Sequence, residues 1–468
     1  MGVGTIAFYG LSFINGNVSS SGGAVYSYGS VVAQYCDFAN NSVAGTSQSG
    51  GGLYAYRAAL SNCNFENNST GALGSGGGVR TYDNLVMTNC TFINNNAVYG
   101  GGASSNATAT IAGCSFIANT ATIYGGGVCV NNSSTLTDCI FINNQSSNNG
   151  GGLYIGGAAT AAVLTGCTFA GNEALNNGGG IYINSNITLS KCTFTGNGAD
   201  SYGGGLYASD TATLNNCNFI GNYSNISGGG IYTKNATVNR CVFVGNTSNA
   251  TGSAVYNATL LIMTNCTISE NTIDLTTQNG AIRGGTSSYI YHCTVTNNAG
   301  GGIKTDNGSS IYLYNSILAG NTNEVDGTPL QYVIGTGTNN FTTGRNMIEG
   351  QPIPGTSPSL NATYRQIFGL NEFDAVKNTQ NVLGNGIAKG TAAAITSTDL
   401  TNSALSSIYH TQVLSNLNTD QNNRNRVPSN GKVTYGAVEA GANTLQSIAA
   451  SLINSNPTKT PPPSAFGT

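Results

Sequence analysis

Short runs in which apolar and polar residues alternate recur along the first 321 residues of the chain. In one run of each repeat, a row of glycines is followed by an aliphatic residue and often by tyrosine, as in residues 150–155. Because side chains on a strand point alternately to its two faces, Leu153 and Ile155 share one face and Tyr154 lies on the other. This pattern predicts a strand that buries its aliphatic residues and turns its tyrosines outward.

A second motif, C-x-F-x-x-N, follows the alternating run in nearly every repeat. Two residues after most of these cysteines comes phenylalanine, and three residues later comes asparagine, as in Cys167, Phe169 and Asn172. The repeated cysteines are 24–28 residues apart: Cys36, Cys63, Cys90, Cys114, Cys139, Cys167, Cys192, Cys217, Cys241, Cys266 and Cys293. A steady period of this length is typical of a solenoid, in which every repeat forms one coil.

An apolar residue also stands three positions before each cysteine, a spacing that does not fit one straight strand. The residue just before the cysteine is usually Asn, Gly or Asp, types that tolerate left-handed dihedral angles, and we therefore expect a one-residue corner there. Three short strands per coil and no helical period predict an all-β fold, a right-handed parallel β-helix of about thirteen coils with about 25 residues each. At ~4.8 Å per coil, the rod would be roughly 60 Å long.

The repeats cover residues 1–321, and beyond them the period is lost. We expect residues 322–442 to form irregular last coils and a C-terminal cap. Residues 443–456 combine a capping-box sequence with one apolar helical face and predict a short capping helix, and residues 457–468 read as a proline-rich tail or linker. At the other end the chain begins inside a coil, so we expect either upstream sequence or end-to-end self-association through the uncapped first coil.

The tandem C-x-F-x-x-N and G-G-[A/L/I/V] motifs of residues 11–321 resemble the repeats of the chlamydial polymorphic outer membrane proteins and, more widely, of secreted bacterial right-handed β-helix repeat proteins. Residues 420–439 are similar to the closing segment of bacterial β-helix proteins that carry surface anchors. The resemblance implies export, an extracellular or bacterial cell-surface location, a role in adhesion, and no cofactor. The opening residues do not have the composition of a secretory signal.

The charge of the chain argues against two classes of partner. Only 15 Lys+Arg and 18 Asp+Glu stand among 468 residues, the net charge is −3, and no segment is rich in lysine or arginine. Nucleic acids and anionic membrane surfaces are bound through such basic clusters, so we expect neither as a partner. No apolar stretch approaches the ~18 residues that a transmembrane helix needs.

Five consecutive coils carry tyrosine at the same outward position: Tyr154, Tyr182, Tyr207, Tyr232 and Tyr256. At ~4.8 Å per coil they form an aromatic stripe roughly 20 Å long. One interpretation is structural, since stacked tyrosines stabilise a sheet surface. The other is functional, with sugar faces of an extended glycan, or another host or cell-surface molecule, bound on the rings. In the flanking coils the same position holds other residues: Arg80, Ser104, Cys129, Arg283 and Lys304.

The twelfth cysteine, Cys129, stands at the outward position and is predicted to be an exposed thiol, open to crosslinking or modification. The eleven repeated cysteines are predicted to form a buried stack of free thiols. No metal is expected, because no C-x-x-C pair is present and one cysteine per coil builds no tetrahedral zinc site. The recurring asparagine predicts a ladder of side-chain amides that bond from coil to coil.

An enzyme on this fold would need carboxylates or basic residues that converge on one face of adjacent coils. Glu173 and Asp200 lie on adjacent coils but in variable turns, Arg57 and Asp83 are expected to form a surface ion pair, and the two histidines have no carboxylate in register. We therefore predict a non-catalytic surface or extracellular β-helix protein that acts in adhesion or surface assembly, with glycan as a candidate ligand. The alternative is a polysaccharide lyase or a glycoside hydrolase.

Overall fold

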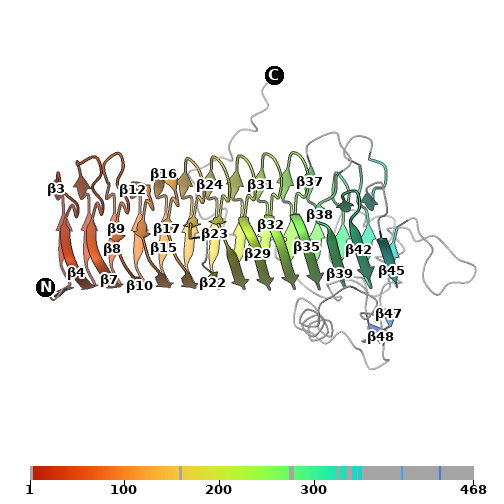
Figure 1. Ribbon diagram of the computed structural model, residues 1–468, viewed down its shortest axis with the longest axis horizontal. Coiled ribbons are helices and arrows are strands. Elements are labelled where there is room, and N and C mark those ends of the chain that lie inside the picture. Colours follow the sequence, from red (N-terminus) through yellow and green to blue (C-terminus); the bar gives the residue numbers. More distant parts are fainter. Residues whose placement is uncertain are drawn as a thin grey trace, which may run out of the picture.

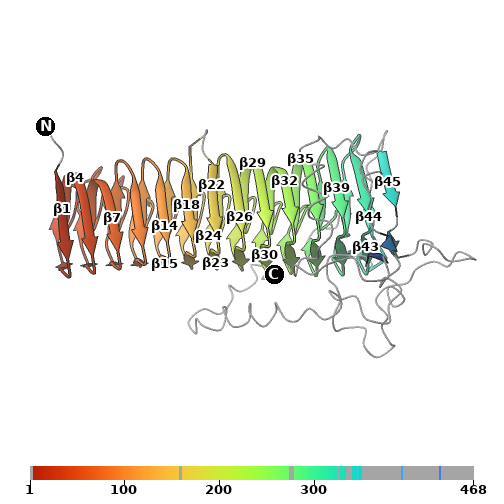
Figure 2. The same ribbon diagram turned by 90° about the horizontal axis from the view of Figure 1, so that it is seen from below.

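The computed structural model describes residues 4–157, 161–273, 279–323, 327–333, 340–344 and 346–349, together with two short strands, β47 (Ala392–Ala393) and β48 (Lys432–Val433). Within these residues the chain consists of strands, turns and bends. The strands stack into one long rod, with β1 (Thr5–Tyr9) at one end and β45 (Asn340–Gly344) at the other (Figure 1, Figure 2). The described part of the chain has no helix of the length and hydropathy needed to cross a membrane.

The largest sheet has 22 strands, all paired in parallel. It contains the strand after each glycine run and the strand before each cysteine, which are one continuous strand in some coils and are separated by a bend in others. Its strands are β1, β4 (Val25–Gln34), β7 (Leu53–Ser61), β9 (Val79–Thr81), β10 (Leu85–Thr88), β13 (Ala103–Ser105), β14 (Ala109–Ala112), β17 (Val128–Val130), β18 (Ser134–Thr137), β21 (Leu153–Ile155), β22 (Ala161–Thr165), β25 (Ile181–Ile183), β26 (Asn186–Ser190), β29 (Leu206–Asn215), β32 (Ile231–Asn239), β35 (Val255–Thr264), β38 (Ile282–Gly284), β39 (Ser287–Tyr291), β41 (Ile303–Thr305), β42 (Ser310–Tyr314), β44 (Tyr332–Val333) and β45.

The second sheet has 14 strands, one at each C-x-F motif or its equivalent. Its strands are β2 (Ser12–Ile14), β5 (Asp37–Ala39), β8 (Asn64–Glu66), β11 (Thr91–Ile93), β15 (Ser115–Ile117), β19 (Ile140–Ile142), β23 (Thr168–Ala170), β27 (Thr193–Thr195), β30 (Asn218–Ile220), β33 (Val242–Val244), β36 (Thr267–Ser269), β40 (Thr294–Thr296), β43 (Ile317–Ala319) and β46 (Met347–Ile348). The strands from β2 to β43 mark thirteen coils, which is the expected number. Twelve full turns separate the first of these strands from the last.

A third sheet of eight short strands follows the ladder asparagines. Its strands are β12 (Asn96–Tyr99), β16 (Thr120–Tyr124), β20 (Gln145–Ser146), β24 (Glu173–Ala174), β28 (Gly198–Ala199), β31 (Tyr223–Ser224), β34 (Thr247–Ser248) and β37 (Thr272–Ile273). Nearer the N-terminus, β3 (Asn17–Val18) and β6 (Ser42–Val43) pair in the same way. The third strand of each coil therefore lies after the asparagine, and the two strands predicted before the cysteine share one sheet.

Each coil turns at corners where one residue adopts a left-handed conformation. All eleven residues that precede the repeated cysteines have positive φ, including Lys191 (55°) and Arg240 (53°), so the one-residue corner is confirmed. The glycine run forms another corner, where Gly150 has φ of 70°. The next glycine, Gly151, has no room for a side chain, because a Cβ there would lie 2.4 Å from the carbonyl oxygen of Glu173 on the following coil.

The core of the rod is filled by aliphatic, phenylalanine and cysteine side chains. Successive phenylalanine rings from Phe13 to Phe243 are stacked with centroids 4.5–5.0 Å apart. The eleven repeated cysteines are buried and free, as predicted, and each Sγ lies 3.2–3.5 Å from the carbonyl oxygen two residues earlier. Each thiol thus donates a weak hydrogen bond across the corner that precedes it.

The asparagine ladder is also present. In each step, Nδ2 donates to Oδ1 of the asparagine on the next coil, at 2.7–3.0 Å. Its members are Asn41, Asn68, Asn95, Asn119, Asn144, Asn172, Asn197, Asn222, Asn246, Asn271, Asn298 and Asn321. At the end of the ladder, Asn321 donates to Gln331 at 2.7 Å.

The coils continue past residue 321. Strand β44 pairs with β41, β45 with β42 and β46 with β43. These three strands form most of a further coil, in register with the coil before it. Apart from these strands, β47 and β48, most of the predicted cap at 322–442 lies outside the described residues. The predicted capping helix at 443–456 and the tail at 457–468 lie outside them entirely.

Candidate functional site

The outward side chains of the strand after each glycine run form one continuous column along the largest sheet. Each member is the register partner of the next on the adjacent coil. We call this set the outward column: Tyr26, Tyr54, Arg80, Ser104, Cys129, Tyr154, Tyr182, Tyr207, Tyr232, Tyr256, Arg283 and Lys304. The five tyrosines of the predicted stripe stand together in its middle, as strand alternation indicates.

The rings from Tyr154 to Tyr256 are stacked on one another. Neighbouring centroids are 4.4–5.2 Å apart and neighbouring planes differ by 1–6°. Each of the five residues is half-buried. Because nearly parallel rings at this spacing cover each other's faces, the stack turns ring edges and hydroxyl groups outward, and the flat faces expected for sugar stacking are not offered.

Burial raises the pKa of Tyr154, Tyr182, Tyr207 and Tyr232 above the usual phenol value, and the neighbouring phenols add to this effect. These hydroxyls therefore keep their protons at neutral and moderately alkaline pH. A protonated phenol both donates and accepts a hydrogen bond. The stack is thus a row of neutral hydroxyl groups repeated at the spacing of the coils.

Residues outside the predicted stripe extend the stack. The ring of Tyr124 stacks on Tyr154 at 4.3 Å, and Tyr202 packs against Tyr232 at 4.8 Å with a tilt of 45°. At the other end, the guanidinium carbon of Arg283 lies 4.3 Å from the centroid of the Tyr256 ring, a cation–π contact. Both added tyrosines immediately precede a glycine run, and this position is the sequence signal that could have revealed them.

The prediction of an exposed thiol at Cys129 is wrong. Strand parity places Cys129 in the outward column, in register with Tyr154, but only 4% of the residue is exposed. The ring of Tyr124 takes the place next to Tyr154 in the stack, which the short cysteine side chain leaves unfilled. Burial raises the pKa of Cys129 to about 12, and the thiol is neutral at physiological pH.

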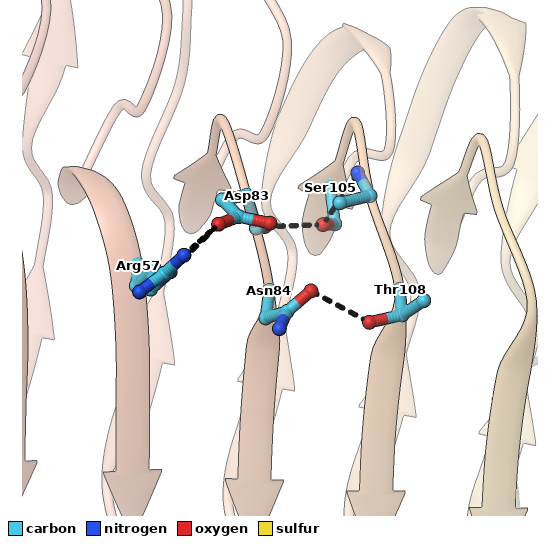
Figure 3. Close-up of polar contacts among 6 residues, drawn as sticks. Arg57, Asp83, Asn84, Ser105 and Thr108 are labelled. Atoms are coloured by element: carbon cyan, nitrogen blue, oxygen red, sulfur yellow. Dashed lines mark hydrogen bonds and ion pairs between the residues drawn. The ribbon is translucent and has the colours of Figure 1, made fainter.

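The expected ion pair between Arg57 and Asp83 is present, with Nη2 and Oδ2 2.6 Å apart (Figure 3). It lies at the bend between the two parts of the largest sheet. Ser105 donates to the backbone carbonyl of Asp83 at 2.9 Å, and Thr108 donates to Asn84 Oδ1 at 2.7 Å (Figure 3). These contacts tie three successive coils together, which is a structural role.

Glu173 in β24 and Asp200, which follows β28, both act electrostatically on Tyr223 in β31. Burial raises the pKa of Tyr223, and the charges of the two carboxylates raise it further. Glu173 Oε2 accepts a hydrogen bond from Gln145 at 3.0 Å, and Asp200 Oδ1 accepts one from Asn225 at 3.2 Å. Each carboxylate is therefore tied to an amide on a neighbouring coil, in the manner of the other coil-to-coil contacts.

A shallow hollow of about 270 Å³ lies on the second sheet near the N-terminal end of the rod. It is lined by Asp37, Phe38, Ala39, Asn64, Phe65, Glu66, Thr91 and Ile93. Asp37 and Glu66 are exposed on adjacent coils, and Asp37 Oδ1 accepts a hydrogen bond from Asn64 at 2.8 Å. The sequence gives no motif for this pair, because the two residues occupy different positions of their coils.

In the part of the chain that the structure describes, no group of three or more His, Cys, Asp or Glu side chains is placed to hold a metal ion. His292 is buried at a corner with φ of 53°, where neighbouring coils have asparagine. His410 lies outside the described residues.

Stacked parallel coils with an internal asparagine ladder define this protein as a parallel β-helix. The family model described as the right-handed beta helix region matches residues 2–147 and 141–286, so the chain belongs to the right-handed β-helix family. This match also confirms the predicted handedness of the coils. The comparisons with curated proteins and with solved structures found no match.

Proposed function

We propose that this protein is a non-catalytic surface or extracellular β-helix protein that acts in adhesion by binding an extended glycan along the tyrosine stack. The row of stacked, half-buried tyrosines from Tyr154 to Tyr256 is the observation that carries the proposal. The coil spacing of ~4.8 Å is close to the length of one sugar residue in an extended chain. The resemblance of the repeats to those of bacterial surface proteins supports the location.

The binding mode follows from the ring geometry. Sugar hydroxyls donate and accept hydrogen bonds, as do the neutral phenols of the stack. The sheet holds these phenols in a fixed row, so little conformational freedom remains to be lost when a linear, repeating ligand binds. A stack with a purely structural role would need its rings but would not need its hydroxyl groups.

The test removes the hydroxyls and keeps the rings. The variant Tyr182→Phe/Tyr207→Phe/Tyr232→Phe should lose retention on a surface-polysaccharide array by about tenfold or more, while its melting temperature changes little. The matched control is Tyr56→Phe/Tyr82→Phe, a stacked tyrosine pair outside the column. Unchanged retention by the triple variant would reject the hydroxyl row as the binding surface.

A polysaccharide lyase or glycoside hydrolase remains the second candidate, and the hollow with Asp37 and Glu66 favours it. Most glycoside hydrolases use a pair of Asp or Glu carboxylates at the site of cleavage. The same polysaccharide panel should then yield new reducing or unsaturated ends in solution. This activity should disappear in Asp37→Asn and in Glu66→Gln; absence of product from the unmodified protein would reject this candidate.

Surface assembly through the first coil stays a prediction. Among the described residues, β1 pairs with β4 on one side, and Ile6, Leu11 and Ile14 are 44–61% exposed. An apolar strand edge of this kind pairs readily with another chain. Light scattering after size-exclusion chromatography should show concentration-dependent association that Ile6→Lys/Ile14→Lys abolishes; a monodisperse monomer at all concentrations would contradict it.

A further inference from the structure

Arg80 differs from two other arginines of the rod in its partner. Arg57 faces Asp83 across adjacent coils, and Arg283 faces Asp306 in the same way. Arg80 faces Ser104, to which its Nη1 donates a hydrogen bond at 2.6 Å. Among the described residues, no carboxylate forms an ion pair with Arg80.

The surroundings of Arg80 do not supply a negative charge by other means. The titratable groups that act on the charge of Arg80 are the Cys129 thiol and the Tyr54 phenol. Cys129 is buried and neutral, because burial raises its pKa to about 12. Arg80 is half-buried, and this burial lowers its pKa. A half-buried cation without an anionic partner is costly in the free protein, and an arriving anion would offset that cost.

The position of Arg80 connects it with the tyrosine stack. Arg80, Ser104, Cys129 and Tyr154 are consecutive members of the outward column, so the backbone of Arg80 lies three coils, or roughly 14 Å, from that of Tyr154, the first residue of the predicted stripe. Its side chain reaches toward Ser104, which is the direction of the stack. A linear ligand that follows the column would therefore meet the hydroxyl row and Arg80 along one line.

We propose that Arg80, oriented by Ser104, binds a carboxylate or sulfate group of an acidic linear polysaccharide whose chain lies along the tyrosine stack. This inference rests on the proposed glycan-binding function and names the class of glycan. A guanidinium presents paired donors in a fork that matches the two oxygens of either anion. The remaining face of the guanidinium, beyond the hydrogen bond to Ser104, is the side that such a group would contact.

The experiment compares ligands that differ in charge alone. Binding is measured by calorimetry for an oligo-uronate, for its carboxyl-reduced neutral form of the same length and linkage, and for a sulfated oligosaccharide. The wild-type protein should bind an anionic form about tenfold or more tightly than the neutral form. Preference for the uronate or for the sulfated chain identifies which anion Arg80 takes.

The variants assign this preference to one residue. Arg80→Gln should bind the acidic and the neutral oligosaccharide equally, and Arg80→Lys should keep part of the preference for the acidic form. The matched control is Arg57→Gln, on the adjacent strand β7, which should bind both forms as the wild type does. Arg80→Gln should melt at or above the wild-type temperature, because it removes a half-buried charge that no anion compensates. A marked fall in melting temperature would indicate a structural role and overturn the proposal.

The outcomes separate the two proposals. Equal affinity for the acidic and neutral forms, with binding still lost in the triple tyrosine-to-phenylalanine variant, overturns the role of Arg80 and leaves the glycan platform standing. No binding of any form by the wild-type protein overturns both. A preference for anions that survives in Arg80→Gln also overturns the assignment to this residue.

Discussion

At the scale of single residues, each ladder asparagine is fully engaged. Asn172 Nδ2 donates to Asn197 Oδ1 and to the carbonyl oxygen of Phe141, both at 2.9 Å. Its Oδ1 accepts from the backbone N–H and the Nδ2 of Asn144. Any substitution therefore leaves several buried polar groups without partners.

Replacement of Asn172 by alanine should lower the free energy of unfolding by about 2–4 kcal/mol, because the buried carbonyl of Phe141 and the amide of Asn144 lose their partner. Urea denaturation followed by circular dichroism measures this change. The control is Asn131→Ala, which removes an exposed coil-to-coil amide bond and should cost less than about 0.5 kcal/mol. Similar losses in both variants would contradict a special role for the buried ladder.

Cys129 gives a second prediction at this scale. Its folded pKa of about 12 lies above the unfolded value of 9.0, so between these pH values the unfolded chain loses a proton that the folded chain keeps. The contribution of this thiol to stability is therefore complete below pH 9 and falls by up to about 1.4 kcal/mol per pH unit as the pH rises toward 12. Urea titrations across this range should show a shallower decline for Cys129→Ala.

The same burial predicts slow thiol chemistry. At pH 8 a thiol reagent should label neither Cys129 nor the eleven stacked cysteines of the native protein, and all twelve should react after unfolding in urea. Rapid labelling of one thiol in the native state, mapped to Cys129 by peptide analysis, would contradict the burial of this residue.

At the scale of the coil, the glycine run sets how closely successive turns approach. Replacement of Gly151 by alanine would place a Cβ 2.4 Å from the Glu173 carbonyl oxygen and should cost about 2–4 kcal/mol of unfolding free energy. Gly4→Ala is the control, because a Cβ at Gly4 meets nothing within 4 Å. A Gly151→Ala protein as stable as wild type would show that the corner relaxes freely.

The coil also shows how far the sequence carries the prediction. The alternation of Leu153, Tyr154 and Ile155 and the regular cysteine spacing predict the strands, the corners and the tyrosine stripe, because these depend on local parity repeated many times. The third sheet escapes prediction because a two-residue strand such as β24 is too short to show alternation. The burial of Cys129 beside the Tyr124–Tyr154 stack and the placing of Asp37 and Glu66 in one hollow escape it, because both involve residues at different positions of the repeat.

At the scale of the whole molecule, the tyrosine stack runs along one side of the rod. We therefore expect the affinity for a linear glycan to depend on the length of that glycan. The rings from Tyr124 to Tyr256 lie one coil apart, so each added sugar residue should gain one further contact until the chain spans the stack, at about six residues. Neutral oligosaccharides of increasing length, titrated by calorimetry, should show affinity rising to a plateau near this length.

Acidic oligosaccharides of the same series should behave differently if Arg80 takes part, because Arg80 lies beyond the ring stack along the same column. Their affinity should keep rising for about two to three further residues before it levels off. In Arg80→Gln the acidic plateau should return to the length found for the neutral series. Affinity that is independent of length in both series would mean that the ligand binds at one point, such as the hollow beside Asp37, and not along the rod.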